Sequence, residues 1–144
     1  MKKQITKSEK QTFNLGKNLA KKLKGGEVIG LVGDLGAGKT VFTKGLARGL
    51  GIKKVITSPT FILMNVYPVM PKAFYGVKQL IHIDCYRIKS LQEILDIGAE
   101  QYFGRPDTVV VIEWADKLKK ILPKNTILIE VEVKKGNQRS IKSI

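Results

Sequence analysis

The stretch Gly33-Asp34-Leu35-Gly36-Ala37-Gly38-Lys39-Thr40 matches the pattern G-x-x-x-x-G-K-[ST] at every position. A β-branched, apolar run precedes it at residues 28–32, and apolar residues at helical spacing follow it over 41–50. This order of strand, loop and helix is the context that a phosphate-binding loop (P-loop) requires. The stretch therefore predicts an α/β fold in which this loop binds the phosphates of a nucleotide.

The residue types in the loop explain how it would hold phosphate. Gly33, Gly36 and Gly38 permit backbone angles closed to other residues, so main-chain N–H groups can turn toward anionic oxygens at the positive end of the following helix. Lys39 adds a mobile positive charge for the β- and γ-phosphates, and the hydroxyl of Thr40 is placed to bind Mg²⁺. The alternative is a glycine-rich turn with an incidental lysine, which would need all five residues to fall in register by chance.

Composition limits the class of protein. A chain of 144 residues that is 43% hydrophobic suits one domain, spanning residues 1–144. No apolar run approaches the roughly 20 residues of a membrane span, and the basic start Met1-Lys2-Lys3 leads into polar residues, so we expect a cytoplasmic protein. Cys85 is the single cysteine, which excludes an intrachain disulfide and a cysteine zinc cluster.

The formal net charge of +14 points to an acidic partner, with nucleic acid as the first candidate. However, the 22 lysines are spread along the chain and are not interleaved with aromatic residues. A generally solvated basic surface explains the charge equally well.

Alternating strand and helix signals in the middle of the chain predict a mainly parallel sheet covered by helices on both faces. A helix is predicted over Ser8–Leu23, with Ser8 and Gln11 as a capping pair, and a second capping box, Ser90 with Glu93, opens a later helix. The remaining expected elements are a short extended piece at 55–56, strands within 61–67, 80–85, 108–112 and 126–133, a mobile connection over 68–76, a turn at 136–137 and a last strand around 141.

Two carboxylates end predicted strands, where ligands bind in doubly wound sheets. Glu113 follows a strand predicted to be buried on both faces and is the best candidate for holding Mg²⁺; the alternative is a surface glutamate. Asp84 could orient or deprotonate an attacking water, or bind the metal through water. Its alternative is a carboxylate that caps a turn or pairs with Arg87.

Other polar and aromatic residues are less decisive. Thr57, Ser58 and Thr60 place hydroxyls in a loop that could sense a γ-phosphate, although they also suit an ordinary loop. His82 alternates with apolar residues on a strand, which favours a structural role. Trp114 is expected to be a packing residue with a possible surface role.

Four motifs together resemble one family. GDLGAGKT, SPTF followed by Tyr67, HIDCYR and IEWAD, in this order over residues 8–141, are similar to the bacterial TsaE (YjeE) ATPases of tRNA threonylcarbamoyladenosine biosynthesis. The resemblance implies a P-loop ATPase, weak alone, that works with TsaB and TsaD proteins. Together they place a threonylcarbamoyl group on adenosine 37 of tRNAs reading codons that begin with A, with tRNA reached through the complex and no membrane involved.

The resemblance also implies roles by position. Asp84 would be the hydrolytic residue, and Thr40 with Glu113 would hold Mg²⁺. Trp114 would lie beside the nucleotide, and Ser58 with Thr60 would form a switch-like loop. The expected ATP-binding residues are Thr12, Gly33, Gly36, Ala37, Gly38, Lys39, Thr40 and Arg139. Cys85 where leucine is usual, Gln11 where glutamate is common, and a long 68–76 connection are small departures from the family pattern.

Two other functions stay open at this point. A small-molecule or nucleoside kinase usually closes a cluster of arginines over the transferred phosphate, and this chain has only four arginines: Arg48, Arg87, Arg105 and Arg139. A non-enzymatic RNA-binding protein could use ATP as a structural ligand; strong, salt-dependent tRNA binding unaffected by nucleotide would favour it.

Overall fold

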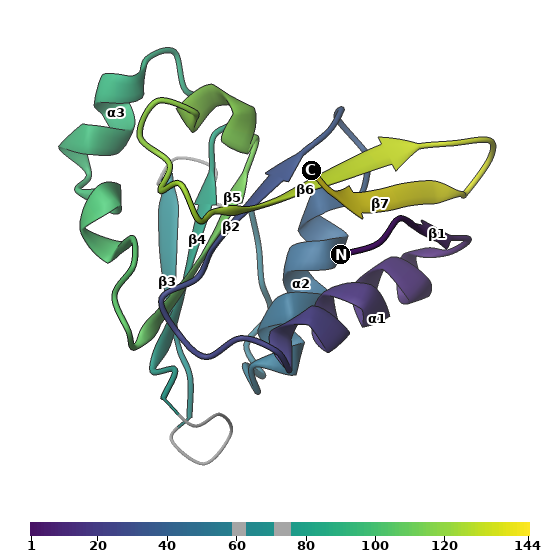
Figure 1. The fold of residues 1–144 in the computed structure, drawn as a ribbon, viewed down its shortest axis with the longest axis horizontal. Helices are drawn as coiled ribbons and strands as arrows, with labels where there is room; N and C mark the ends of the chain where they lie inside the picture. Colours follow the sequence, from purple (N-terminus) through teal and green to yellow (C-terminus); the bar gives the residue numbers. More distant parts are fainter. Residues whose placement is uncertain (59–62, 71–75) are drawn as a thin grey trace.

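The fold is built on one sheet, which Figure 1 shows running through the molecule between two layers of helix. The computed structural model describes residues 1–58, 63–70 and 76–144. In these ranges the strand order is β1-β7-β6-β2-β5-β4-β3. The strands are β1 (Gln4–Thr6), β2 (Val28–Val32), β3 (Met64–Pro68), β4 (Gln79–Asp84), β5 (Thr108–Glu113), β6 (Ile127–Val133) and β7 (Arg139–Ser143).

The sheet is mixed, with a parallel centre and antiparallel edges. The central strands β6, β2, β5 and β4 are parallel to one another, as the sequence predicts. At the two edges, β1–β7, β6–β7 and β3–β4 pair antiparallel, so the sheet is not purely parallel. The short connection between β6 and β7 explains one edge, since a parallel pair needs a crossover of a dozen or more residues.

Helices cover both faces of the sheet, which confirms that part of the prediction. All six residues of β5 are buried, and their side chains alternate between the faces. Val109 and Val111 pack in the cluster that contains Phe42, whereas Val110 and Ile112 pack in the cluster that contains Leu118. The first face carries α1 (Glu9–Ala20) and α2 (Lys39–Gly49); the second carries α3 (Leu91–Asp96) and the 3₁₀ helices η1 (Ala99–Tyr102) and η2 (Ala115–Leu118). None of the helices in the described ranges is long and apolar enough to cross a membrane.

Local sequence signals predicted where the helices begin better than where they end. The Ser8 hydroxyl caps α1 by accepting a hydrogen bond from the amide of Gln11, and the capping box of Ser90 and Glu93 is present, so both predicted starts are confirmed. α1 ends at Ala20, before the predicted Leu23. No strand forms at 55–56, and β1 was not predicted. Of the predicted 68–76 connection, residues 71–75 lie outside the described residues.

Helices α1 and α2 approach at the level of their backbones. A Cβ added to Gly16 would overlap the carbonyl oxygen of Phe42, and one added to Gly45 would overlap the carbonyl oxygen of Phe13. Both glycines are buried. This close packing fixes the position of α1 against the helix that follows the glycine-rich loop, and with it the position of Thr12.

We expect Gly45→Ala to lower the free energy of unfolding by about 1–3 kcal/mol, because the helices must separate to admit the methyl group. This loss outweighs the roughly 1 kcal/mol by which alanine favours a helix over glycine. Denaturant unfolding measures it, with Lys44→Ala as the control because Lys44 is the exposed neighbour on α2. Equal stability of Gly45→Ala and the unmodified chain would contradict the backbone contact.

Candidate nucleotide and metal site

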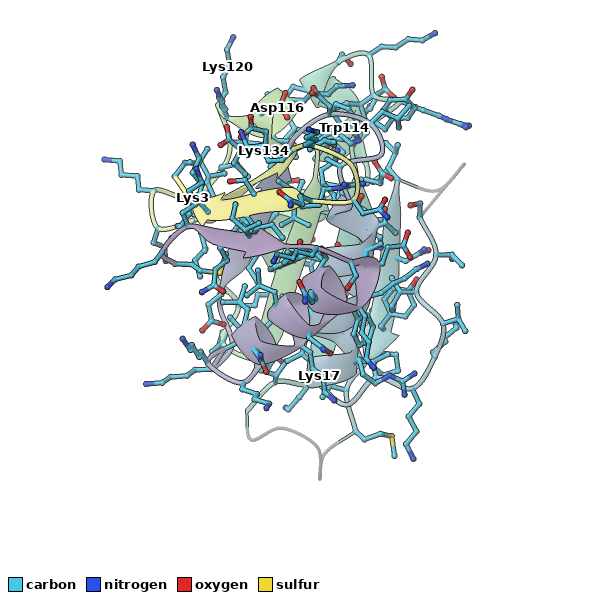
Figure 2. All side chains as sticks on the ribbon, turned by 90° about the vertical axis from the view of Figure 1, so that its right-hand side faces the viewer. Lys3, Lys17, Trp114, Asp116, Lys120 and Lys134 are labelled. Carbon is cyan, nitrogen blue, oxygen red and sulfur yellow. The ribbon has the colours of Figure 1, made fainter. Side chains whose placement is uncertain are left out.

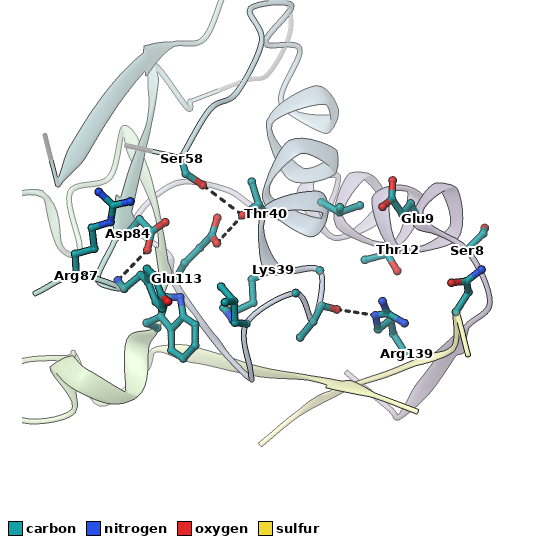
Figure 3. Close-up of a pocket in the computed structure, with 18 of the residues that line it drawn as sticks. Ser8, Glu9, Thr12, Lys39, Thr40, Ser58, Asp84, Arg87, Glu113 and Arg139 are labelled. Atoms are coloured by element: carbon teal, nitrogen blue, oxygen red, sulfur yellow. Dashed lines mark hydrogen bonds between the residues drawn. The ribbon is translucent and has the colours of Figure 1, made fainter. Parts of the chain in front are cut away.

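A cavity of about 630 Å³ lies at the carboxyl ends of β2, β4 and β5 (Figure 3). Gly33 and Thr57 do not line it, and Thr60 lies outside the described residues. The structure brings every other predicted site residue to this cavity: Thr12, Gly36, Ala37, Gly38, Lys39, Thr40, Ser58, Asp84, Glu113, Trp114 and Arg139.

The glycine loop, residues 33–40, has a backbone that only glycine supports at two points. Gly33 has φ 141°, and a Cβ there would overlap the carbonyl oxygen of Val131 on β6. Gly38 is the N-cap of α2 with φ 106° and offers no side-chain acceptor to the helix. The first amides of α2 therefore lack a partner within the helix or its cap. Together with the positive end of the helix dipole, they are available to bind an anion.

Lys39 is folded back onto its own loop. Its Nζ donates to the carbonyl oxygens of Gly33 at 2.6 Å and Asp34 at 2.8 Å. The same ammonium lies 3.8 Å from the centroid of the Trp114 ring, and the residue is only 4% exposed. Burial lowers the pKa of Lys39 from its ordinary value, opposed by the negative charges of Glu113 and other nearby carboxylates. An anion in the cavity would compete with the two carbonyls for this ammonium.

Glu113 is buried at the centre of a hydrogen-bonded group. Its Oε2 accepts from the hydroxyl of Thr40 at 2.8 Å, and its Oε1 lies 2.9 Å from Nε2 of His82 and accepts from the hydroxyl of Thr43 at 3.3 Å. Ser58 approaches the Thr40 hydroxyl at 3.5 Å (Figure 3). A buried carboxylate so bonded is not a surface glutamate, which removes that alternative for Glu113.

Asp84 sits beside Glu113, because the two residues pair in register on neighbouring parallel strands. One oxygen, Oδ1, accepts from the amide of Tyr86 at 2.9 Å. Burial raises the pKa of Asp84 and the charge of Glu113 adds to the rise, while the Tyr86 amide and the charge of Lys39 oppose it. Among the ion pairs of the described residues none joins Asp84 to Arg87, although Arg87 lines the same cavity.

Strand β1 contacts two residues, Thr12 and Arg139, that line the cavity away from Asp84 and Glu113. Thr6 pairs in register with Arg139 on β7, and its hydroxyl lies 2.8 Å from that of Thr12 on α1. Nε of Arg139 donates to the carbonyl oxygen of Ala37 at 3.0 Å (Figure 3). The unpredicted strand β1 thus links Thr12 and Arg139, which are distant in sequence, at the same end of the glycine loop.

Trp114 has a strained backbone, with φ 60°, the one non-glycine residue of the described chain in the left-handed region. This conformation turns its ring over Lys39 and beside Tyr86, at 5.2 Å between ring centroids. Trp114 is thus more than the packing residue that its position alone suggested.

Several cavity residues were given no site role by the sequence patterns. Tyr86 lies two residues after Asp84 in the HIDCYR motif, and Ser8 caps the helix that carries Thr12, so closeness to a motif in the sequence was the available signal. The lining residues missed in this way are Ser8, Glu9, Leu35, Val41, Leu63, Tyr86, Arg87 and Asn137.

The donor set suits Mg²⁺ bound together with phosphate. Thr40 and Glu113 offer a hydroxyl and a carboxylate oxygen, the hard ligands that Mg²⁺ prefers, and nucleotide sites commonly supply only one or two protein ligands. A Cβ added to Gly36 meets no atom within 4 Å, so the cavity is open beside the loop.

Comparison with known proteins gives one consistent result. The family model described as threonylcarbamoyl adenosine biosynthesis protein TsaE matches residues 6–141. The tRNA threonylcarbamoyladenosine biosynthesis protein TsaE of Treponema pallidum is 41% identical over 95% of this chain and 96% of that protein. The protein of the same name from Bacillus subtilis is 38% identical over 94% and 80%. A crystal structure of Bacillus subtilis YdiB has a TM-score of 0.76 at 33% identity, covering 98% of this chain and 82% of that chain. The chain therefore belongs to the TsaE family of threonylcarbamoyl adenosine biosynthesis proteins.

Proposed function

We propose that this chain is a cytoplasmic P-loop ATPase that binds Mg²⁺–ATP in the cavity and acts with TsaB and TsaD partners in threonylcarbamoylation of adenosine 37, in tRNAs reading codons that begin with A. The proposal rests on one observation. Lys39, Thr40 and Glu113 line the same cavity beside the glycine loop, in a member of the TsaE family. Each of these groups has a part to play in binding a nucleotide.

The phosphates would bind to the glycine loop. The amides of Gly36, Ala37, Gly38, Lys39 and Thr40 belong to a loop and helix start suited to anions. Lys39 would leave the carbonyls of its own loop for the β- and γ-phosphates, and Arg139 and Thr12 would lie toward the remaining phosphates and the base.

Mg²⁺ would be held by Thr40 and by Glu113, directly or through its water shell, and would neutralise charge that develops on the phosphates. Asp84 lies one strand from Glu113, lines the same cavity and keeps Oδ2 free of the Tyr86 amide. We assign Asp84 the part of orienting and deprotonating the attacking water. Ser58, close to Thr40, and Thr60 would belong to a loop that responds to the γ-phosphate.

The test is incubation of the untagged chain with Mg²⁺–ATP and a set of nucleosides. An ATPase releases only ADP and phosphate, whereas a kinase produces a phosphorylated acceptor. Slow release of ADP and phosphate with no phosphorylated nucleoside is the expected result. A phosphorylated acceptor would favour the kinase alternative instead.

The RNA-binding alternative rests on the net charge of +14. Figure 2 shows Lys3, Lys17 and Lys120 on different sides of the molecule, and all three are exposed. Charge dispersed in this way is better explained by a solvated basic surface than by a single nucleic-acid-binding face. Strong tRNA binding by the isolated chain, steeply salt-dependent and unaffected by nucleotide, would support the alternative.

Partner affinity should depend on the bound nucleotide. If ATP orders the loop near Ser58 through its γ-phosphate, the surface offered to TsaB and TsaD differs between the ATP and ADP states, and the coupling is reciprocal. We expect Kd values that differ by about tenfold or more, equivalent to about 1.4 kcal/mol, between ADP and a non-hydrolysable ATP analogue. Titration in ADP, in the analogue and without nucleotide measures this. Equal affinities in all three states would refute a nucleotide-controlled switch.

A further inference from the structure

His82 is the single histidine of the chain, and it lies fully buried in the middle of β4. Its neighbours Ile81 and Ile83 pack in the cluster on the α3 face of the sheet. His82 therefore faces the other side, where Glu113 and the start of α2 lie. A polar ring in this position has to be explained by its partners, because an unpaired buried polar group is costly.

The hydrogen bond of His82 determines its tautomer. Nε2 lies 2.9 Å from Oε1 of Glu113 in a fully buried pair. An ionised carboxylate only accepts, so Nε2 carries the hydrogen. Nδ1 is buried and has no hydrogen-bond partner among the described residues. A hydrogen there would be an unsatisfied donor, so the neutral ring with hydrogen on Nε2 fits the site.

The two oxygens of Glu113 have separate tasks. Oε1 is held by His82 and, at a longer distance, by Thr43, while Oε2 meets the hydroxyl of Thr40. A glutamate side chain has several rotatable bonds, so it needs such contacts to keep one orientation. The single hydroxyl hydrogen of Thr43 is shared between Oε1 and the nearer carbonyl oxygen of Lys39, at 3.1 Å, so His82 at 2.9 Å makes the shorter and undivided contact to Oε1.

We propose that His82 is a positioning residue for the metal site: by holding Oε1 of Glu113 it keeps Oε2 directed toward Thr40, where Mg²⁺ would bind with the nucleotide. This inference rests on the proposed Mg²⁺–ATP site and adds to it a residue that touches neither metal nor nucleotide. Partners of this kind orient a ligand, and their loss typically costs about 10- to 100-fold in metal affinity.

The first test is NMR of the untagged, ¹⁵N-labelled chain. Because there is only one histidine, its ring nitrogens can be assigned without ambiguity. We expect the tautomer protonated on Nε2, with a slowly exchanging ring proton whose resonance shifts in Glu113→Gln. A ring protonated on Nδ1 alone, or a resonance unchanged in Glu113→Gln, would overturn the proposal.

The second test is calorimetry of ATP binding with Mg²⁺ and with EDTA. In His82→Leu, which removes the donor, we expect the Mg²⁺ enhancement of ATP affinity to fall about 10- to 100-fold, with metal-free affinity unchanged. His82→Gln places an amide N–H near the position of Nε2 and should retain most of the enhancement. Ile83→Val, on the opposite face of β4, is the control for disturbance of the strand.

The outcomes separate this inference from the proposed function. If the unmodified chain binds ATP with the same affinity in Mg²⁺ and in EDTA, the proposed metal site is overturned, and this inference with it. A normal Mg²⁺ enhancement in both the unmodified chain and His82→Leu would overturn the positioning role alone. Equal losses in His82→Gln and His82→Leu would also overturn it, since the ring shape and not the hydrogen bond would then matter. Thermal melting verifies that each variant is folded.

Discussion

Lys39→Ala should weaken ATP binding by at least about 100-fold. Hydrogen bonds to charged groups are worth about 1.5–3 kcal/mol each, and Lys39 would make at least two of them with the β- and γ-phosphates. The backbone amides of the glycine loop would remain, but amide dipoles do not replace a full positive charge. Isothermal titration calorimetry measures the loss directly.

A second readout comes from Trp114, the single tryptophan of the chain, whose ring lies 3.8 Å from the Lys39 ammonium. Movement of Lys39 to the phosphates should change tryptophan emission when ATP is added. The matched control is Lys44→Ala, which removes an exposed lysine from the same helix and should bind ATP normally. Unchanged ATP affinity and hydrolysis in a folded Lys39→Ala chain would refute the nucleotide site.

The sequence predicted the centre of the fold because its signals there are local. The glycine loop must lie between β2 and α2, and the run at 108–113 must be a buried strand, so Lys39, Thr40 and Glu113 could be placed together before the structure. The edges were less predictable. β1 has only three residues, and it forms because β7 offers it an unpaired edge, which no local pattern encodes.

Side-chain contacts across the sheet were the least predictable part of the site. His82 sits in an apolar alternation that fits a core residue, and only the pairing of β4 with β5 brings its ring to Glu113. The conformation of Trp114 likewise depends on the turn after β5 and not on its own preference, since φ 60° is unfavourable for a large residue. Both contacts arise from tertiary structure.

Glu113→Ala and Asp84→Asn should separate metal binding from hydrolysis. Glu113 is the carboxylate bonded to Thr40, so its removal takes away a metal ligand and also leaves the ring of His82 without its acceptor. We expect Glu113→Ala to lower ATP affinity in the presence of Mg²⁺ by about 100-fold, and to lower it little in EDTA. Calorimetry in the two buffers measures the difference, and a loss equal in both would contradict the metal role.

Asp84→Asn should leave Mg²⁺–ATP bound but lower kcat by about 10²- to 10⁴-fold, the range expected when a general base is removed. Burial raises the pKa of Asp84, so the ionised, proton-accepting form is lost as the pH falls, at a higher pH than for an ordinary aspartate. In the unmodified chain kcat/KM should therefore fall on the acid side, and Asp84→Asn should lack this dependence.

Asp107→Asn is the matched control, because Asp107 lies outside the cavity, directly before the strand that ends at Glu113. If Asp84→Asn lost binding while Glu113→Ala lost only turnover, the two roles would be reversed, and the metal would have to lie on the β4 side of the cavity.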